Sequence, residues 1–528
     1  MFWMVLPRNS LEKWAPWLIF AWVFIVFLPV IGAGFVNLDD GGNFLNNPHF
    51  RGLDWARLRW MLTPAHQEHF QPLSWLTLAL DYTLWGMNPA GFHLTNLLIH
   101  GANAVLFYFI SLRLIKAAGA KVEPIVAAAL AALLFGLHPL RVESVAWVTE
   151  RRDVLSGFFY LLTVLGYLRG VPIGWTLAVY LMALLSKSMT VSLPVALLVL
   201  DVYPLKRLRD SASSTKALKE KIPFAILALA AAAIAIGTHV SSDKMPSLSL
   251  YTAQMRLCVA AHGLVFYLWK SLLPFKLFAF YPLPKEISFR IGHFALCGTL
   301  TLALSLVFIA RRRAWPGALA AWFYYALTLF PVLGLVGYLP HLGADRYSYL
   351  SCLGWAVLAS VWLLGAGAWL RLRLAAAGLT LTLMSFLTWR QTFIWKDSES
   401  LWGYMATDPG HGVAQNALGI FAMERGDSLQ AAERFKAALS IDPDFGAAHN
   451  NLGGVLSAQG RLDEALQHYR EALRTSPDHW AVNYNIASIL MAQGKRDEAL
   501  AYYREELRIN PSSEKTREAL ARFGSIRQ

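Results

Sequence analysis

Long apolar stretches separated by short polar loops fill the chain up to about residue 395. About 20 consecutive apolar residues in a helix cross the hydrocarbon core of a bilayer, so this pattern predicts a bundle of membrane-spanning helices. One further apolar stretch, 255–274, is interrupted by Lys270, Pro274 and Lys276, which predicts an interfacial or re-entrant segment. The eleven predicted spans are 14–34, 92–113, 123–138, 154–169, 172–187, 189–204, 222–239, 292–310, 316–339, 347–369 and 374–392.

A second periodicity begins near residue 396. Pro409, Pro443, Pro477 and Pro511 recur every 34 residues, and glycine, alanine and aromatic positions recur with the same period. This pattern is typical of tetratricopeptide helix pairs, here at about 412–445, 446–479 and 480–513, followed by a capping helix. The sequence therefore predicts an all-α protein with two domains, a membrane helix bundle at 1–395 and a tetratricopeptide solenoid at 396–528.

Composition supports the membrane assignment. The 528 residues are 56% hydrophobic, with a mean hydropathy of +0.41. The net charge of +13 does not indicate a nucleic-acid partner, because much of the lysine and arginine lies in short loops where it orients helices. The three cysteines are widely spaced and predict no disulfide framework or metal motif. We expect no metal site at the histidines either, because the spacing of His66, His69, His93 and His100 fits no strong ligand motif.

The basic loops predict the orientation of the bundle. With eleven spans, the basic clusters, including 206–221 and 311–313, all lie on the cytoplasmic side. The first apolar run lacks a small-residue cleavage site, so we interpret it as an uncleaved helix. An odd number of spans puts the C-terminal repeats on the non-cytoplasmic side. The compact size favours a bacterial inner membrane protein with its repeats in the periplasm.

The predicted outer loops contain the candidate chemistry. Asp39 and Asp40 directly follow the first span. A carboxylate held just outside the membrane at the mouth of a helix bundle suits a general base. The alternative is a solvated turn, because Asp-Asp-Gly-Gly is a good loop sequence.

Ionisable residues crowd the second outer loop, among them His138, Glu143, Arg152 and Asp153. Arginine binds phosphate with two parallel hydrogen bonds, so this loop can form an anion and acceptor site. A salt-bridged interfacial loop is the alternative.

Three more charged residues lie next to predicted spans. Lys187 occupies a turn between two apolar helices, where it either snorkels to the interface or contacts a lipid phosphate. Asp345 and Arg346 follow the ninth span. They either pair with each other, or Arg346 closes on a phosphate leaving group.

Taken together, these segments resemble a known family. Asp-Asp after the first span, QPLSWLTLALDYTLWGMNPAGFHLTNLLIHGANAVLFY, HPLRVESVAWVTERRDVLSG, LSKSMTVSLPVALLVLDV, ADRYSYL and the repeats follow one another in this order. The combination, over about residues 14–511, resembles the transmembrane and tetratricopeptide repeat-containing O-mannosyltransferases and their bacterial relatives. That family is similar to the GT-C class of membrane glycosyltransferases.

The resemblance implies a function and a mechanism. The expected enzyme moves a hexose such as mannose from a polyprenyl-phosphate carrier to a hydroxyl, with Ser or Thr of a protein favoured, on the non-cytoplasmic face and with inversion. An acidic residue of the first outer loop serves as the base, which points to Asp39 or Asp40, with Asp39 slightly favoured.

The remaining expectations concern the donor and the supporting residues. Arg152, Lys187 and Arg346 are expected to stabilise the donor phosphate. His138, Glu143, Asp153 and Asp345 are expected to support the site or the acceptor. The lipid-linked sugar is the donor, no cofactor is tightly bound, and a divalent metal is not indicated.

The concave face of the repeats predicts a protein partner. Asn451 and Asn485 precede a repeated aliphatic residue, and such side chains can bind an extended peptide backbone, with Tyr484 beside them. Alternatively, the asparagines only stabilise the fold. Because Asn416 is one position out of register, we expect no regular asparagine ladder.

Two other functions remain open at the level of sequence. A GT-C enzyme can glycosylate a lipid or polysaccharide and use the repeats as an assembly scaffold. A membrane adaptor or transporter needs no enzymatic site, but a transporter typically has charges near the bilayer midplane and duplicated, broken helices. In this chain the charges cluster at one face and no duplication of spans is visible.

Overall fold

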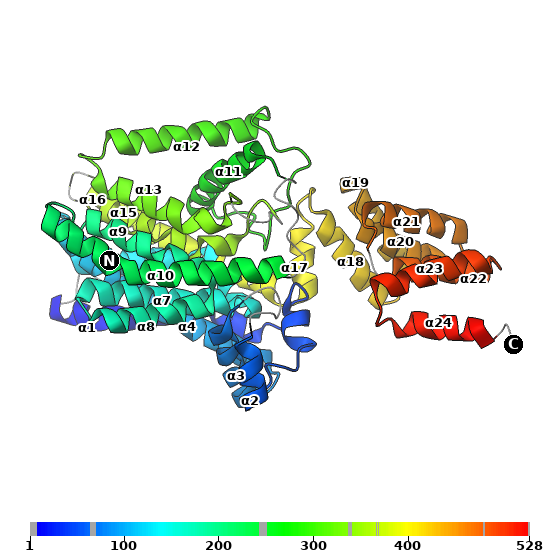
Figure 1. The fold of residues 1–528 in the computed structure, drawn as a ribbon. Helices are drawn as coiled ribbons and strands as arrows, with labels where there is room; N and C mark the ends of the chain where they lie inside the picture. Colours follow the sequence, from blue (N-terminus) through cyan, green and yellow to red (C-terminus); the bar gives the residue numbers. More distant parts are fainter. Residues whose placement is uncertain are drawn as a thin grey trace. The chain divides into compact units, whose positions relative to one another are not determined.

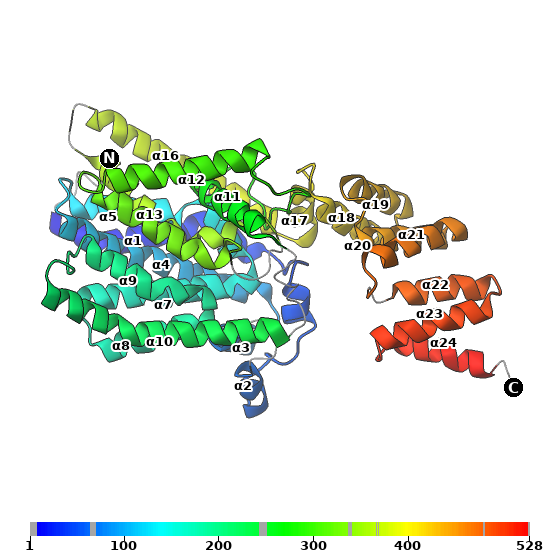
Figure 2. The same ribbon diagram turned by 45° about the horizontal axis from the view of Figure 1, so that its top comes forward.

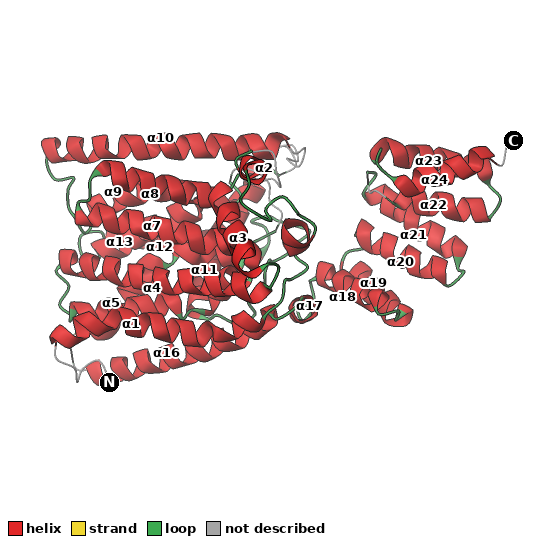
Figure 3. Ribbon diagram, turned by 90° about the horizontal axis from the view of Figure 1, so that it is seen from below, coloured by secondary structure: helices red, strands yellow, loops and turns green. Residues whose placement is uncertain are grey.

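The computed structural model describes residues 8–63, 70–241, 251–335, 341–365, 367, 369–478 and 481–525. His66 and His69 therefore lie outside the described residues. Within the described ranges every element is helical (Figure 3), apart from one isolated antiparallel bridge between Tyr281 and Gly343. This confirms the predicted all-α class.

The chain divides into two compact units, the first ending at Ser398 and the second beginning at Glu399. In the first unit, each of the eleven stretches that the sequence predicts to span contains a helix. The principal helices are α1 (Arg8–Phe27), α4 (Pro89–Ala118), α5 (Pro124–Gly136), α7 (Arg151–Arg169), α8 (Ile173–Ser186), α9 (Leu193–Val202), α10 (Ser211–Ser241), α11 (Ala253–Leu272), α12 (Gly292–Ala310), α13 (Pro316–Leu329), α15 (Leu353–Leu364) and α16 (Leu370–Thr392).

The number of spans is smaller when it is judged by helix length. Five described helices are long and apolar enough to cross a membrane, and seven are if each of two bent helix pairs counts as one span. The bends, of 55° and 64°, fall in the pairs Pro124–Gly136 with Pro139–Ala146 and Asp345–Ser351 with Leu353–Leu364. The number of eleven spans and the side of the membrane on which the repeats lie stay predictions.

The stretch that we predicted to be interrupted is one continuous helix, α11. Lys270 does not break it, because its ammonium donates to the backbone carbonyls of Phe275 and Lys276 at 2.7 and 2.8 Å, just beyond the helix end. Pro274 and Lys276 fall after Leu272, where the helix has already ended. The three residues therefore do not break the helix. This helix is not among the described ones that are long and apolar enough to cross a membrane, and its interfacial or re-entrant placement stays a prediction.

The buried centre of this unit is α4, which packs against α1, α5 and α7. Most of α5 is alanine and leucine and nearly all of it is buried, because small side chains let neighbouring helices approach closely. Gly101 and Gly136 mark two such approaches, since a Cβ atom there would lie 2.7 Å from Phe20 and from Val23.

Short elements gather at one end of the bundle, where Figure 1 shows α2 and α3 beyond the long helices. Several of these elements carry residues of the candidate site: some connect α5 to α7, and others precede α15. They are η2 (Leu28–Gly32), η3 (Gly41–Leu45), α2 (Trp55–Met61), α3 (Pro72–Trp85), η4 (Pro139–Arg141), α6 (Val142–Ala146), η5 (Val148–Glu150), η6 (Ser188–Ser192), η8 (Phe330–Val332), η9 (Asp345–Tyr347), α14 (Ser348–Ser351) and η10 (Phe393–Trp395).

The second unit is a run of helix pairs, coloured from yellow to red in Figure 2. Its aromatic repeat residues Phe435, Tyr469 and Tyr503 are buried in one hydrophobic core. Gly419 and Gly453 face the first two of these rings, and a Cβ atom would come within 2.5 and 2.8 Å of them. The helices are α17 (Ser398–Met405), α18 (Gly412–Glu424), α19 (Ser428–Ile441), α20 (Gly446–Ala458), α21 (Leu462–Thr475), α22 (Val482–Ala492), α23 (Arg496–Ile509) and α24 (Glu514–Ser525).

Candidate active site

The two aspartates after the first helix have different surroundings. Asp39 is exposed, whereas Asp40 is 1% exposed. One carboxylate oxygen of Asp40 accepts from the backbone of Val36 at 3.0 Å. The other accepts from the indole of Trp147 at 2.9 Å and from the hydroxyl and backbone N–H of Thr149 at 2.6 and 3.3 Å. Asp40 therefore ties the first outer loop to the second.

Burial also changes the protonation of Asp40. Loss of solvation raises its pKa to about 6, although the hydrogen bonds from Thr149, Val36 and Trp147 act in the opposite direction. A buried carboxylate that accepts four hydrogen bonds fixes the positions of the groups that donate them. Asp39 is the solvent-exposed member of the pair.

Glu150 is the centre of a charged cluster, and it is completely buried. Arg152 donates to it through Nε and Nη2 at 3.2 and 2.7 Å, and the Lys187 ammonium donates at 2.9 Å. The Nε atom of Arg346 lies 3.3 Å from the same carboxylate. Burial raises the pKa of Glu150, but the charges of the three cations outweigh it and hold the pKa well below its usual range. The structure thus brings together all three residues that we predicted to bind phosphate.

Arg346 is held in place from several directions. Its backbone N–H and its Nη1 atom donate to the two oxygens of Glu143 at 2.7 and 2.5 Å, and Nη1 also donates to the carbonyl of Ala279 at 2.9 Å. The guanidinium lies over the ring of Trp147, 5.4 Å from its centroid. Since Trp147 donates to Asp40, this indole connects the aspartate pair to the cation cluster.

Asp345 points away from its neighbour Arg346. It accepts from the hydroxyl of Tyr281 at 2.9 Å, in the loop between α11 and α12. Arg346 is bound to Glu143 and Glu150. The alternative in which Arg346 closes on a phosphate leaving group stays a prediction. Asp345 instead fastens the loop that also supplies the Ala279 carbonyl.

His138 has a supporting position. Its Nε2 atom lies 3.0 Å from the carbonyl of Ser271, and its Nδ1 atom accepts from the backbone of Leu140 at 3.2 Å. The Nε2–H tautomer satisfies both contacts, so this histidine fixes the second outer loop against α11. His93 and His100 are likewise buried, against the carbonyls of Gly34 and Gly136 respectively.

A small polar cavity of about 20 Å³ lies beside the cluster. Asp153 lines it and accepts from Lys187 at 2.6 Å and from Ser144 at 3.1 Å. Other lining residues include Ser156 of α7, Thr328 of α13 and Arg346. This volume holds about one water molecule.

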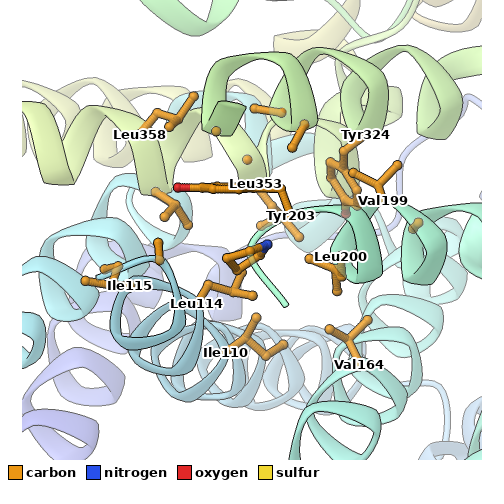
Figure 4. A pocket seen from close by; sticks show the side chains of 18 of the residues that line it. Ile110, Leu114, Ile115, Val164, Val199, Leu200, Tyr203, Tyr324, Leu353 and Leu358 are labelled. Carbon is orange, nitrogen blue, oxygen red and sulfur yellow. The ribbon is translucent and has the colours of Figure 1, made fainter. Parts of the chain in front are cut away.

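A larger apolar cavity of about 170 Å³ lies one helical turn along the same two helices. Tyr160 of α7 lines this cavity four residues after Ser156, and Tyr324 of α13 lines it four residues before Thr328. Residues four apart lie on the same face of a helix. The hydroxyl of Tyr324 donates to Leu350, which lines the polar cavity, at 3.0 Å. Figure 4 shows aliphatic side chains such as Leu200, Val164 and Leu353 converging on the apolar cavity.

Several site residues escaped the sequence reasoning. Glu150 has no distinguishing signal in the sequence beyond its place among the charges of the second outer loop, and Trp147 and Tyr281 look like ordinary aromatic residues of membrane loops. Arg151 is also fully buried and pairs with Asp81 at 2.6 Å, which fastens the start of α7 to α3. The run Glu-Arg-Arg-Asp at 150–153 was the available signal, because four consecutive charges beside an apolar helix need partners.

In the repeats, each of the two asparagines predicted to bind a peptide donates to an asparagine of the preceding helix pair. The amide of Asn451 donates to Asn416 at 3.0 Å, and that of Asn485 donates to Asn450 at 3.1 Å. Each pair joins residues 35 apart, and the two pairs use different asparagines of α20, Asn451 and Asn450. Binding of a peptide by Asn451 and Asn485 stays a prediction. Tyr484 packs against Tyr503 with ring centroids 5.7 Å apart.

Comparison with known proteins finds a repeat family and several relatives. Residues 416–479 and 455–514 match a family model described as tetratricopeptide repeat. Human protein O-mannosyl-transferase TMTC4 is 31% identical over 180 residues, which is 31% of this chain and 24% of the relative. Drosophila melanogaster protein O-mannosyl-transferase Tmtc2 is 32% identical over 154 residues, covering 28% of this chain and 16% of the relative.

These matches confirm the resemblance that the motifs predict. The match spans less than a quarter of the length of either relative. Among solved structures, MamA is 22% identical over 26% of this chain and 80% of its own, with a TM-score of 0.20, which is too low to support a structural inference.

Proposed function

We propose that the protein is an integral membrane glycosyltransferase that moves mannose or a similar hexose from a polyprenyl-phosphate carrier to a hydroxyl of a protein. The observation that carries this proposal is the adjacency of two cavities, a polar one beside clustered cations and an apolar one along the same helix faces. A lipid-linked sugar phosphate has the same two-part chemistry. The similarity to protein O-mannosyl-transferases supports mannose and a protein acceptor.

In this proposal Asp39 is the base. Its carboxylate takes the proton of the acceptor hydroxyl, whose oxygen forms a bond to the anomeric carbon on the face opposite the phosphate. The bond between the anomeric carbon and the phosphate oxygen breaks, and the leaving polyprenyl phosphate keeps the electron pair. The configuration at the sugar therefore inverts.

Arg152, Lys187 and Arg346 stabilise the charge that develops on that leaving phosphate. In the structure they are paired with Glu150, which keeps three cations together in a buried position until the donor arrives. A sugar phosphate needs more room than the polar cavity of about 20 Å³, so we expect the Arg346 side chain to shift when the donor binds. Asp40, through Trp147 and Thr149, holds the two outer loops in register.

The face of the membrane follows from the predicted topology. Asp39 and the cation cluster belong to loops that the basic residues place on the non-cytoplasmic side. The repeats then lie on the same side as the acceptor, the periplasm in a bacterial cell, and their surface delivers or selects the protein.

The test is sugar transfer by the purified full-length protein in lipid vesicles, with radiolabelled polyprenyl-phosphate mannose and periplasmic protein as acceptor. We expect label on protein, and its loss by about 10²–10⁴-fold in Asp39→Asn, because one positioned base contributes about that much. Glu286→Gln, which changes an exposed carboxylate in the loop before α12, serves as the matched control and should retain wild-type transfer.

Asp40→Asn should lose less activity than Asp39→Asn. Equal transfer by wild type and Asp39→Asn would contradict the assignment of the base. Label recovered on lipid or glycan rather than protein would contradict the acceptor, and absence of transfer from any of several carrier-linked sugars would contradict the enzyme.

A further inference from the structure

Away from the candidate active site, α11 and α12 bring together two histidines and a cysteine. These helices pack side by side, as the neighbouring green helices of Figure 1 show. His262 lies buried within α11, and His293 and Cys297 lie four residues apart on one face of α12. The Nδ1 atom of His262 is 2.8 Å from Nε2 of His293, and Sγ of Cys297 is 4.0 Å from that same Nε2 atom.

The three donor atoms all lie within 4.8 Å of one another. Two imidazole nitrogens and a thiolate are ligands that zinc and similar metals prefer. In a tetrahedral zinc centre the donor atoms are separated by roughly 3.3 Å for two nitrogens and roughly 3.6 Å for nitrogen and sulfur, given the usual bond lengths. The observed separations of 2.8 Å between the two nitrogens and 4.0 Å between nitrogen and sulfur differ from these values by about half an ångström.

We propose that His262, His293 and Cys297 bind a transition-metal ion, with zinc as the favoured ion, and thereby tie α11 to α12. Binding replaces the histidine–histidine hydrogen bond with two metal–nitrogen bonds and releases the thiol proton to solvent as the metal–sulfur bond forms. Water completes the coordination. The rings of Phe266 and Phe294 flank His262, with centroids 5.4 and 6.1 Å away, and provide an apolar shell.

The position of the cluster gives such a metal a structural role. The loop between the two helices lies between the ligands in sequence, and it carries Tyr281 and Ala279, which contact Asp345 and Arg346. A metal that joins α11 to α12 fixes both ends of this loop. The metal therefore supports the loop without taking part in sugar transfer.

The experiment uses the purified full-length protein in detergent, stripped of metal and titrated with Co²⁺ as a coloured substitute for Zn²⁺. We expect one Co²⁺ per chain, with the charge-transfer band of a cobalt–thiolate bond, and displacement of the cobalt by Zn²⁺. The band should disappear in Cys297→Ser and persist in Cys258→Ser, which changes a buried cysteine that lies on α11 and outside the cluster. Zn²⁺ should also raise the melting temperature of the wild type but not that of Cys297→Ser.

His293→Ala provides a second variant because His293 is exposed and its replacement leaves the helix core intact. We expect at least a tenfold loss of Co²⁺ affinity in this variant. The proposal is overturned by the absence of stoichiometric cobalt in the wild type. It is also overturned by a thiolate band that survives Cys297→Ser, or by unchanged affinity in His293→Ala.

Discussion

At the scale of single residues, burial separates the roles of side chains that look alike in sequence. Asp39 and Asp40 are adjacent, yet one is exposed and the other has four hydrogen-bond donors around a nearly inaccessible carboxylate. Arg152 and Arg151 are adjacent as well, and one joins the Glu150 cluster while the other pairs with Asp81. Each pair illustrates that residues adjacent in the chain can face different elements.

Asp40→Asn is expected to remove the part of the pH dependence of the unfolding free energy that comes from protonation of Asp40. The pKa of Asp40 is raised in the folded protein from 3.8 to about 6, so the folded state holds the proton more tightly than the unfolded state. The stability gained from this proton is fully present below about pH 4 and is lost as the pH rises through about 6. Relative to the variant, the wild type should gain up to about 3 kcal/mol on going from neutral pH to about pH 4, because one pKa unit corresponds to about 1.4 kcal/mol.

Thermal unfolding in detergent across this pH range measures the difference between the two proteins. Glu286→Gln serves as the control, and its unfolding should follow the wild-type pH dependence. Parallel curves for wild type and Asp40→Asn would contradict the raised pKa.

At the scale of elements, α7 and α13 organise the candidate site. Residues four apart on each helix line first the polar and then the apolar cavity, so the helical period itself places charge beside hydrocarbon. The sequence shows the helical period of each segment, but it does not show that these two helices line the same cavities. Both helices contact α14, and α13 also packs against α9 and α15.

Ala320→Phe should discriminate between donors by chain length, because Ala320 lines the apolar cavity and a phenyl ring occupies space that a long isoprenoid needs. We expect the KM for a long-chain polyprenyl-phosphate sugar to rise by about tenfold, which corresponds to about 1.4 kcal/mol of binding. The KM for a carrier of two isoprene units should change little. Initial-rate kinetics with both donors measure the two values.

Ala303→Phe, on the exposed side of α12 and outside the cavity, is the matched control for this experiment. Equal effects of Ala320→Phe on long and short donors would place the lipid chain elsewhere.

At the scale of the whole molecule, a membrane bundle and a repeat solenoid form separate compact units of one chain. Each unit has its own buried core, and the repeats pair their asparagines from one helix pair to the next. In the proposed function the first unit performs the chemistry and the second selects the protein acceptor.

The double variant Tyr484→Ala/Asn485→Ala tests this division of labour. We expect the KM for a large protein acceptor to rise by about tenfold, because recognition through the repeat surface is lost. The kcat for a short serine- or threonine-containing peptide should stay unchanged, because the transfer site is intact. Gln467→Ala, an exposed change on α21, is the control. A parallel loss with both acceptors would contradict a separate acceptor surface.

The sequence alone was sufficient for the features that depend on local periodicity. Apolar runs and a 34-residue repeat specify helices wherever the chain is placed, because hydrogen bonds within a helix are local and repeats pack against their nearest neighbours. Charged residues at the ends of apolar helices also pointed to the loops that form the site, and Arg152, Lys187 and Arg346 were among the residues named.

Only the tertiary structure decided which of these charges meet. Arg346 and Glu150 are almost 200 residues apart in the chain, and no local pattern predicts their contact. The same holds for Trp147 beneath Arg346, for Tyr281 on Asp345, and for His262 beside Cys297. Long-range contacts depend on how helices pack and turn about their axes, and a single sequence does not display that geometry.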